Sequence, residues 1–188
     1  RERPVKVRKS TRSDAERERP ERSRGSSVPT SPGVTLGFDD IEQACGDLSY
    51  LPNHLCLVNR GSEAVAGGAR LVVTEQQATF QGRSTYRNGV TVTVEGKQRY
   101  RLEFGPPKGK ALLPGLYTEA MRWPFNDGPY PGMDVTIGSS GCNTEEGQFR
   151  ILELNQSESG GIRRLVADFE TSCNGAVGRI AVEQLDVS

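Results

Sequence analysis

Residues 90–104 read VTVTVEGKQRYRLEF, and this stretch decides the predicted fold. Apolar and polar side chains alternate over residues 90–94 and again over residues 100–104, which is the period of a β-strand with one buried face. The turn residues Gly96-Lys97 lie between the two runs. We therefore expect the stretch to form a β-hairpin.

Similar strand signals occur on both sides of this hairpin, separated by clusters of Gly, Pro, Asn and Asp that favour turns. The predicted strands are residues 54–59, 69–74, 78–81, 90–95, 98–104, 115–121, 133–137, 147–154, 161–170 and 176–184. One short helix is predicted at residues 39–45, where acidic side chains occupy the first turn. We predict an all-β domain over residues 34–188, an antiparallel β-sandwich of about 9–10 short strands with this helix at its start.

The chain has 188 residues and no net charge, but the two signs of charge are unevenly distributed. Residues 1–33 contain ten Arg or Lys and five acidic residues, net +5, so the rest of the chain carries net −5. This segment has too few apolar residues to offset the entropy of ordering it. We predict a disordered or extended basic arm with a Ser/Pro-rich linker, followed by one globular domain.

Electrostatic contacts of the arm are expected near its start. Six of its positive charges are Arg1, Arg3, Lys6, Arg8, Lys9 and Arg12. Such a cluster attracts acidic surfaces, so a neighbouring protein subunit or an anionic envelope polymer would suit it. Nucleic acid is disfavoured because the arm has no aromatic side chains on which bases could stack. The alternative is a solvated spacer without a partner.

Four cysteines and a single histidine constrain the chemistry of the domain. Cysteines at the ends of strand-like segments, in a chain with one imidazole, favour structural disulfides over a metal site. Three pairings are possible, and we favour Cys45 with Cys56 and Cys142 with Cys173, because each pair joins neighbouring segments. Disulfides predict an oxidising location: the extracellular medium, the cell surface or the periplasm.

The sequence carries no recognisable catalytic or cofactor motif. Ser139-Ser140-Gly141 lacks the nucleophile-elbow pattern, and His54 is the only candidate imidazole base. Acids in the loops around Gly138–Gly141 have no calcium-binding spacing. We predict a protein that is not an enzyme and needs no metal or cofactor. An undetected hydrolase would require two carboxylates close together in a pocket.

No window has the run of about 18 apolar residues that a membrane-spanning helix needs, so no transmembrane segment is predicted. The start of the chain also lacks the apolar region of a signal peptide. We expect a signal or anchor, if there is one, to precede Arg1.

The aromatic stretch over residues 115–132 is the best candidate for contact with a ligand. Its candidate residues are Tyr117, Arg122, Trp123 and Tyr130. Aromatic side chains beside a long polar residue stack on sugars or grip peptide segments. A binding role predicts that Trp123 or Tyr130 is exposed in a concave patch.

A core strand is the competing interpretation of the same stretch. Strand alternation would place one face of it in the core, with Tyr117, Met121, Trp123 and Phe125 on that face. Arg122 would then pair with a carboxylate of the domain such as Asp168.

Several blocks in the second half of the chain occur in a recognisable order. They are Pro114 to Phe125 (PGLYTEAMRWPF), Pro131-Gly132, Gly141-Cys142-Asn143, Gly147 to Glu153 (GQFRILE), Ala167-Asp168-Phe169 and Cys173. Over residues 100–182 the chain thereby resembles an uncharacterised family of bacterial exported β-sandwich proteins. The resemblance implies an all-β exported domain with a Cys142–Cys173 bridge and no catalytic residues. Ser172 stands where that family is expected to have histidine, and the arm and the Cys45, Cys56 pair look like additions.

These observations predict a non-catalytic exported module of the cell surface or envelope that binds a polymer or a protein partner. One alternative is a structural subunit of a surface assembly that docks through its basic arm. A second alternative is a carboxylate-dependent hydrolase.

Overall fold

The computed structural model describes residues 38–59, 70–141, 143–157, 159–172 and 175–184. These residues belong to one compact unit, Thr35–Ser188. The predicted basic arm over residues 1–33 and both cysteines of the predicted Cys142–Cys173 bridge lie outside the described residues. Within the described ranges, no helix is long and apolar enough to cross a membrane.

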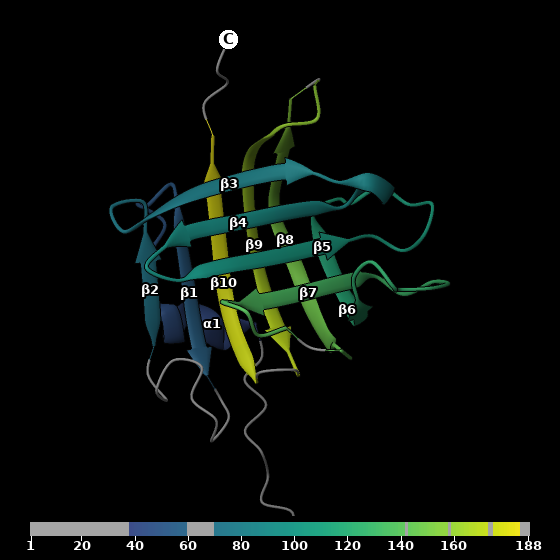
Figure 1. Cartoon of the computed structure of the whole chain (residues 1–188), viewed down its shortest axis with the longest axis horizontal. Coiled ribbons are helices and arrows are strands. Elements are labelled where there is room, and N and C mark those ends of the chain that lie inside the picture. The colour runs from purple at the N-terminus through teal and green to yellow at the C-terminus, as the bar shows by residue number, and fades with distance from the viewer. Residues whose placement is uncertain (1–37, 60–69, 142, 158, 173–174, 185–188) are drawn as a thin grey trace, which may run out of the picture. The chain divides into compact units, whose positions relative to one another are not determined.

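One short helix and ten strands make up this unit (Figure 1). They are α1 (Asp39–Cys45), β1 (His54–Asn59), β2 (Leu71–Thr74), β3 (Ala78–Ser84), β4 (Val90–Gly96), β5 (Arg99–Gly105), β6 (Gly115–Arg122), β7 (Gly132–Ile137), β8 (Glu146–Gln156), β9 (Ile162–Thr171) and β10 (Ala176–Glu183), with a short 3-10 turn η1 (Tyr86–Asn88) before β4. The predicted helix and all ten predicted strands are confirmed, with ends that differ by at most three residues. The all-β class is therefore confirmed.

The ten strands form one continuous sheet, in the order β2-β1-β10-β9-β8-β6-β7-β5-β4-β3. The prediction of a sandwich of separate sheets is wrong, because this single sheet bends back on itself. In Figure 1 the strands β3, β4, β5 and β7 cross over β1, β10, β9 and β8. The physical reason is β6, which pairs antiparallel with β8 and parallel with β7 and so joins the two layers.

A bulge in β6 allows the sheet to turn this corner. The register of β6 against β8 shifts between Tyr117 and Ala120. Within the shift, Glu119 has a φ of 55°, in the left-handed region that residues other than glycine rarely occupy. Bulges of this kind bend a strand and redirect its side chains.

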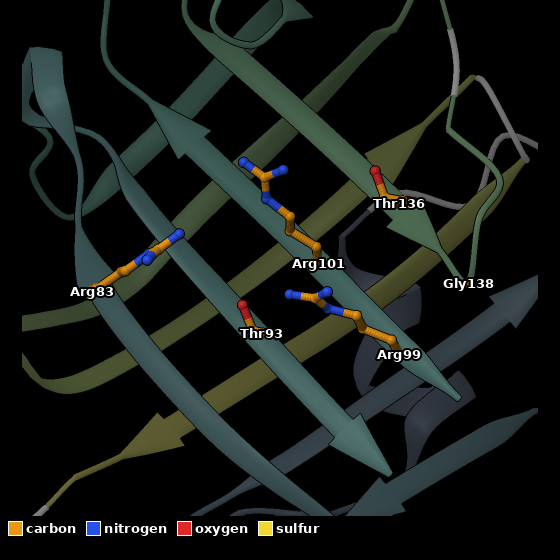
Figure 2. A pocket seen from close by; sticks show the side chains of 6 residues that line it. All are labelled: Arg83, Thr93, Arg99, Arg101, Thr136 and Gly138. Carbon is orange, nitrogen blue, oxygen red and sulfur yellow. The ribbon is translucent and has the colours of Figure 1, made fainter. Parts of the chain in front are cut away.

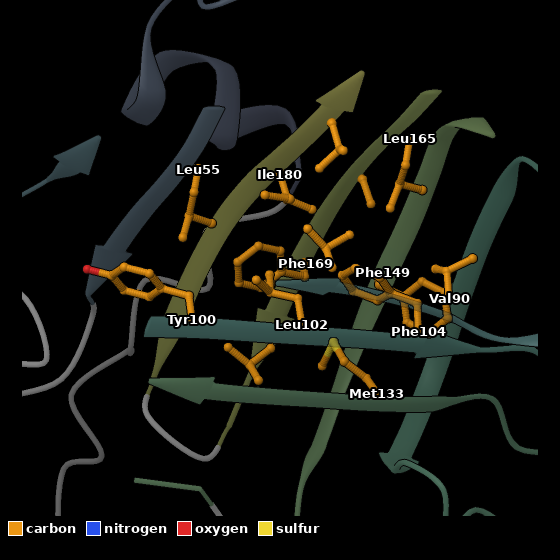
Figure 3. Packing of buried hydrophobic residues seen from close by; sticks show 14 of the residues in the cluster. Leu55, Val90, Tyr100, Leu102, Phe104, Met133, Phe149, Leu165, Phe169 and Ile180 are labelled. Atoms are coloured by element: carbon orange, nitrogen blue, oxygen red, sulfur yellow. The ribbon is translucent and has the colours of Figure 1, made fainter. Parts of the chain in front are cut away.

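The core lies between the two crossing layers (Figure 3). The predicted hairpin is confirmed as β4 and β5, with Val90 opposite Phe104 and Val94 opposite Tyr100. The ring of Phe104 lies 5.1 Å from that of Phe149 across the core, measured between ring centroids. Alternation along each strand thus buries one face of both layers against the other.

Edge strand β3 nearly closes the sheet. The N–H of Ser84 donates to the carbonyl of Gly160 at 3.3 Å, in the turn between β8 and β9. The N–H of Gly82 donates to the side chain of Gln184 at 2.7 Å. These bonds satisfy backbone groups that an open edge would leave unpaired.

Helix α1 covers the outer face of β1 and β10. The predicted disulfide between Cys45 and Cys56 is confirmed, with Cα atoms 6.0 Å apart, and it attaches α1 to β1. Ile41, Leu48 and Val177 are buried with the two cysteines in a second, smaller apolar cluster. The disulfide indicates a non-reducing compartment.

Candidate functional site

Trp123 is a core residue and offers no surface to a ligand. Its side chain is only 2% exposed. The indole lies directly on the backbone of three glycines, and a Cβ on Gly89, Gly105 or Gly132 would collide with it. Glycine is required here because the ring leaves no room for a side chain.

Tyr117 also has a structural role. Its ring stacks on Phe149 at a centroid distance of 4.6 Å. Its hydroxyl donates to the carbonyl of Leu113 at 2.8 Å and accepts from the N–H of the same residue at 2.9 Å. These contacts fix the segment that leads into β6.

The predicted single face of Tyr117, Met121, Trp123 and Phe125 does not form. Met121 is 41% exposed and Phe125 is 68% exposed, whereas Trp123 is buried. The register shift in β6 interrupts the alternation on which that prediction depended.

Arg122 does not pair with Asp168. Its Nε lies 3.5 Å from a carboxylate oxygen of Asp134 on β7. Its guanidinium also lies over the ring of Phe125, with the Cζ atom 5.2 Å from the ring centroid. Asp168 is on β9, where two other arginines neutralise it.

Tyr130 is the predicted contact residue that remains accessible, since it is 41% exposed. It lines one of three adjoining hollows of about 350, 390 and 400 Å³ along β6 and the start of β8. We call this run the β6 groove. The side chains that give it its chemical character are Glu119, Met121, Arg122, Phe125, Tyr130, Glu145 and Glu146.

Glu145 is the most unusual residue of the groove. It is only 2% exposed. One carboxylate oxygen, Oε2, accepts a hydrogen bond from the N–H of Val135 at 3.1 Å. Val135 lies on β7 beyond Gly132 and Met133, the residues that pair with β6. The other carboxylate oxygen, Oε1, has no hydrogen-bond partner among the described residues.

Burial, together with the smaller effect of the nearby charge of Asp134, raises the pKa of Glu145 to about 7, against a hydrogen bond from Thr171 that lowers it. Sequence reasoning placed Glu145 only among unpatterned loop acids. Its burial follows from the path of the chain between β7 and β8, for which the sequence has no signal.

A second candidate site lies on the outer face of β3, β4, β5 and β7 (Figure 2). We call it the arginine pocket: a hollow of about 270 Å³ lined by Arg83, Thr93, Arg99, Arg101, Thr136 and Gly138. Sequence reasoning missed it. Alternation within residues 98–104 does place Arg99 and Arg101 on the face opposite the core, but only the strand order adds Arg83 and the two threonines.

A further hollow, of about 500 Å³, lies between β2 and the turn that joins β4 to β5. It borders residues 60–69, which are outside the described ranges, so we assign it no role. Across the described part of the chain, no group of three or more His, Cys, Asp or Glu side chains is placed to hold a metal ion.

Comparisons with protein-family models, with curated proteins and with solved structures find no match to this chain. The resemblance of residues 100–182 to a bacterial exported family therefore stays a prediction. The class that the fold defines is a disulfide-bonded all-β domain, and its function has to be argued from the two sites.

Proposed function

We propose that this protein is a non-catalytic exported module that binds a neutral carbohydrate polymer of the cell surface or envelope in the β6 groove. The observation that supports this most directly is Glu145, which lines a groove beside exposed aromatic rings and whose buried Oε1 has no hydrogen-bond partner among the described residues. A buried carboxyl oxygen without a partner is costly whether or not it carries the proton, so a ligand hydroxyl, which can both donate and accept, would stabilise it.

The groove combines apolar and hydrogen-bonding surfaces. Phe125 and Tyr130 are 68% and 41% exposed and present ring surface to solvent. Sugar rings have apolar C–H faces that stack on such rings, and hydroxyl groups that donate to carboxylates. Three adjoining hollows suit an extended chain better than a compact ligand.

The charge of the groove selects against anionic polymers. Four carboxyl groups line it, those of Glu119, Glu145, Glu146 and Glu170, against the single guanidinium of Arg122. That guanidinium is already held by Asp134. A neutral polymer avoids the repulsion that an acidic one would meet.

The strained backbone of Glu119 also supports a binding site at this place. Its φ of 55° costs about 1–2 kcal/mol relative to an ordinary conformation. Such strain concentrates at functional sites, where it serves to present side chains. Glu119 lines two of the three hollows.

The buried carboxyl groups of Glu145 and Asp134 do not form the pair that the hydrolase alternative needs. Glu145 and Asp134 lie near enough for the charge of Asp134 to raise the pKa of Glu145. However, Asp134 is tied to Arg122 and is not among the residues that line the groove. Glycoside hydrolysis needs both carboxyl groups to flank the bond that breaks.

The test is co-sedimentation of the protein with insoluble cellulose, chitin and β-1,3-glucan. We expect at least one of these to bind saturably, and Tyr130→Ala or Phe125→Ala to weaken binding about five- to tenfold, because each removes a stacking surface. The matched control is Tyr50→Ala, since Tyr50 is 72% exposed but follows α1 and lines none of the three hollows.

Two results would overturn the proposal. Equal losses in the control and in the groove variants would mean that the aromatic rings of the groove are not the contact. Release of reducing sugars, abolished by Glu145→Gln, would make the protein a hydrolase.

A further inference from the structure

We propose that the arginine pocket is a second binding site, separate from the β6 groove, and that it takes a tetrahedral oxyanion: a phosphate or sulfate group. The inference does not depend on the function proposed for the groove. It follows from which side chains the sheet brings together on the outer face of β3, β4, β5 and β7, which α1 does not cover (Figure 2).

Strand register places the lining residues in one plane. Thr93 of β4 is the cross-strand partner of Arg101 of β5, and Arg101 is the partner of Thr136 of β7. Side chains two positions apart on a strand share a face, so Arg99 lies beside Arg101. Arg83 extends over the same face from β3, and the guanidinium groups reach the pocket from different sides (Figure 2).

The positive charges of the pocket are only partly compensated. Arg101 donates to the buried carboxylate of Glu103 at 2.8 Å, which uses one of its donors. Arg99 lies 3.2 Å from Glu95, but both side chains are more than half exposed, and such pairs are weak. Arg83 has no ion-pair partner among the described residues. An anion in the pocket would relieve the mutual repulsion of three guanidinium groups.

The donors define the chemistry of the ligand. Guanidinium groups are planar forks that match phosphate and carboxylate oxygens, and the hydroxyl of Thr93 adds a further donor, whereas that of Thr136 donates to Asp134 at 3.2 Å. One fork would satisfy the two oxygens of a carboxylate, whereas donors from the three strands β3, β4 and β5 suit the several oxygens of a tetrahedral anion. A hollow of about 270 Å³ holds one such group and is smaller than the pockets that enclose drug-sized ligands.

The direct test is an NMR titration of the amide resonances of the full chain with sodium phosphate and sodium sulfate at constant ionic strength. We expect saturable shifts that centre on Arg83, Thr93, Arg101 and Thr136. Sodium acetate serves as the carboxylate control and should bind at least about fivefold more weakly, because it has fewer acceptor oxygens. Shifts that rise without saturation, or that spread evenly over the protein, would overturn the proposal.

A pair of double variants separates the pocket from general surface charge. Arg83→Gln with Arg99→Gln should weaken phosphate binding about tenfold or more, since two charge-assisted contacts are lost. Lys108→Gln with Lys110→Gln removes the same charge from an exposed loop and should change binding less than about twofold. Equal losses in the two double variants would overturn the proposal. Arg83→Lys keeps the charge without the fork and should fall between the wild type and Arg83→Gln.

A second titration distinguishes a free ion from a group carried by a polymer. If the site takes a phosphate group within a chain, a short polyphosphate should bind more tightly than inorganic phosphate. The Arg83→Gln, Arg99→Gln variant should bind the two with similar affinity. Equal affinity per phosphate identifies the free ion as ligand. Polysaccharide binding by the β6 groove should be unchanged in this variant, so failure at either site is recognised independently.

Discussion

The two outer faces of the folded sheet both carry arginines, but in opposite circumstances. Under α1, the cross-strand row Arg150, Asp168 and Arg179 alternates in sign, and its acid is fully buried. Arg179 donates to Asp168 at 2.6 Å and Arg150 at 3.0 Å. On the uncovered face, threonines flank Arg101 on both sides.

This difference separates structural charges from charges available for binding. On the covered face, the carboxylate of Asp168 accepts hydrogen bonds from both arginines, and the ring of Phe38 lies 5.1 Å from the guanidinium carbon of Arg150. That row can therefore be buried beneath a helix. The threonines of the open face neutralise nothing; there Arg101 has one carboxylate partner, Glu103, and Arg99 has the exposed Glu95, so these arginines keep donors for a ligand from solvent.

Asp168→Ala should have the largest effect on the covered face. It leaves two arginines without a carboxylate, so we expect the free energy of unfolding to fall by about 3–5 kcal/mol. Urea denaturation at pH 7 measures this. A loss below about 1 kcal/mol would mean that the two arginines do not need the carboxylate of Asp168, and the distinction between the two faces would fail.

Removing the Cys45–Cys56 disulfide tests what holds α1 against the covered face of the sheet. Cys45 and Cys56 are 11 residues apart, and in the chain-entropy model Cys45→Ser with Cys56→Ser costs about 3 kcal/mol. Thermal unfolding of the double variant checks the value. Hydrogen exchange should show faster exchange in α1 than in β4 and β5. Uniform acceleration across all strands would contradict a local role.

Glu145→Gln tests a second buried acid, which lacks two guanidinium partners of the kind that Asp168 has. Because the pKa of Glu145 is raised from 4.5 to about 7, the folded state holds its proton between these pH values, and stability from this group falls as pH rises through 7. The loss is on the order of 3 kcal/mol above pH 7. Measured by urea denaturation, the free energy of unfolding of Glu145→Gln relative to that of the wild type should thus be more favourable at pH 8.5 than at pH 5.5. An equal difference at both pH values would refute this.

Glu95→Gln should have the smallest effect. Glu95 and Arg99 are 58% and 64% exposed on the open face, and pairs of this kind contribute about 0–1 kcal/mol. Urea denaturation should show little change, while freeing Arg99 should tighten phosphate binding slightly. A stability loss as large as that of Asp168→Ala would erase the contrast between the faces.

Local features of the fold were predictable because they depend on neighbouring residues. Alternation located the strands, and the turn at Gly96-Lys97 predicted the hairpin of β4 and β5. Proximity along the chain favoured the pairing of Cys45 with Cys56. In the candidate site, exposure was predicted for Trp123 or Tyr130, and Tyr130 is the one that is exposed, while Trp123 is buried.

The misplaced residues lie after the register shift or beyond the end of the strand. Alternation predicts a face only while the register and the strand continue; Met121 follows the shift near Glu119, and Trp123 and Phe125 follow the end of β6 at Arg122. The partner of Arg122 could not be predicted either, because β6 meets β7 only through the parallel pairing at the corner of the sheet. Neither feature has a signal in the residues themselves.

The sequence by itself determined the all-β class, the ten strands and the helix with its disulfide, because strand period, turn residues and short loops act over a few residues. Tertiary structure alone decided that the strands form one bent sheet, that Glu145 is buried with an unsatisfied oxygen, and that Arg83, Arg99 and Arg101 share a pocket. These features depend on which strands become neighbours. Strand order arises from packing across the whole core, and no local pattern encodes it.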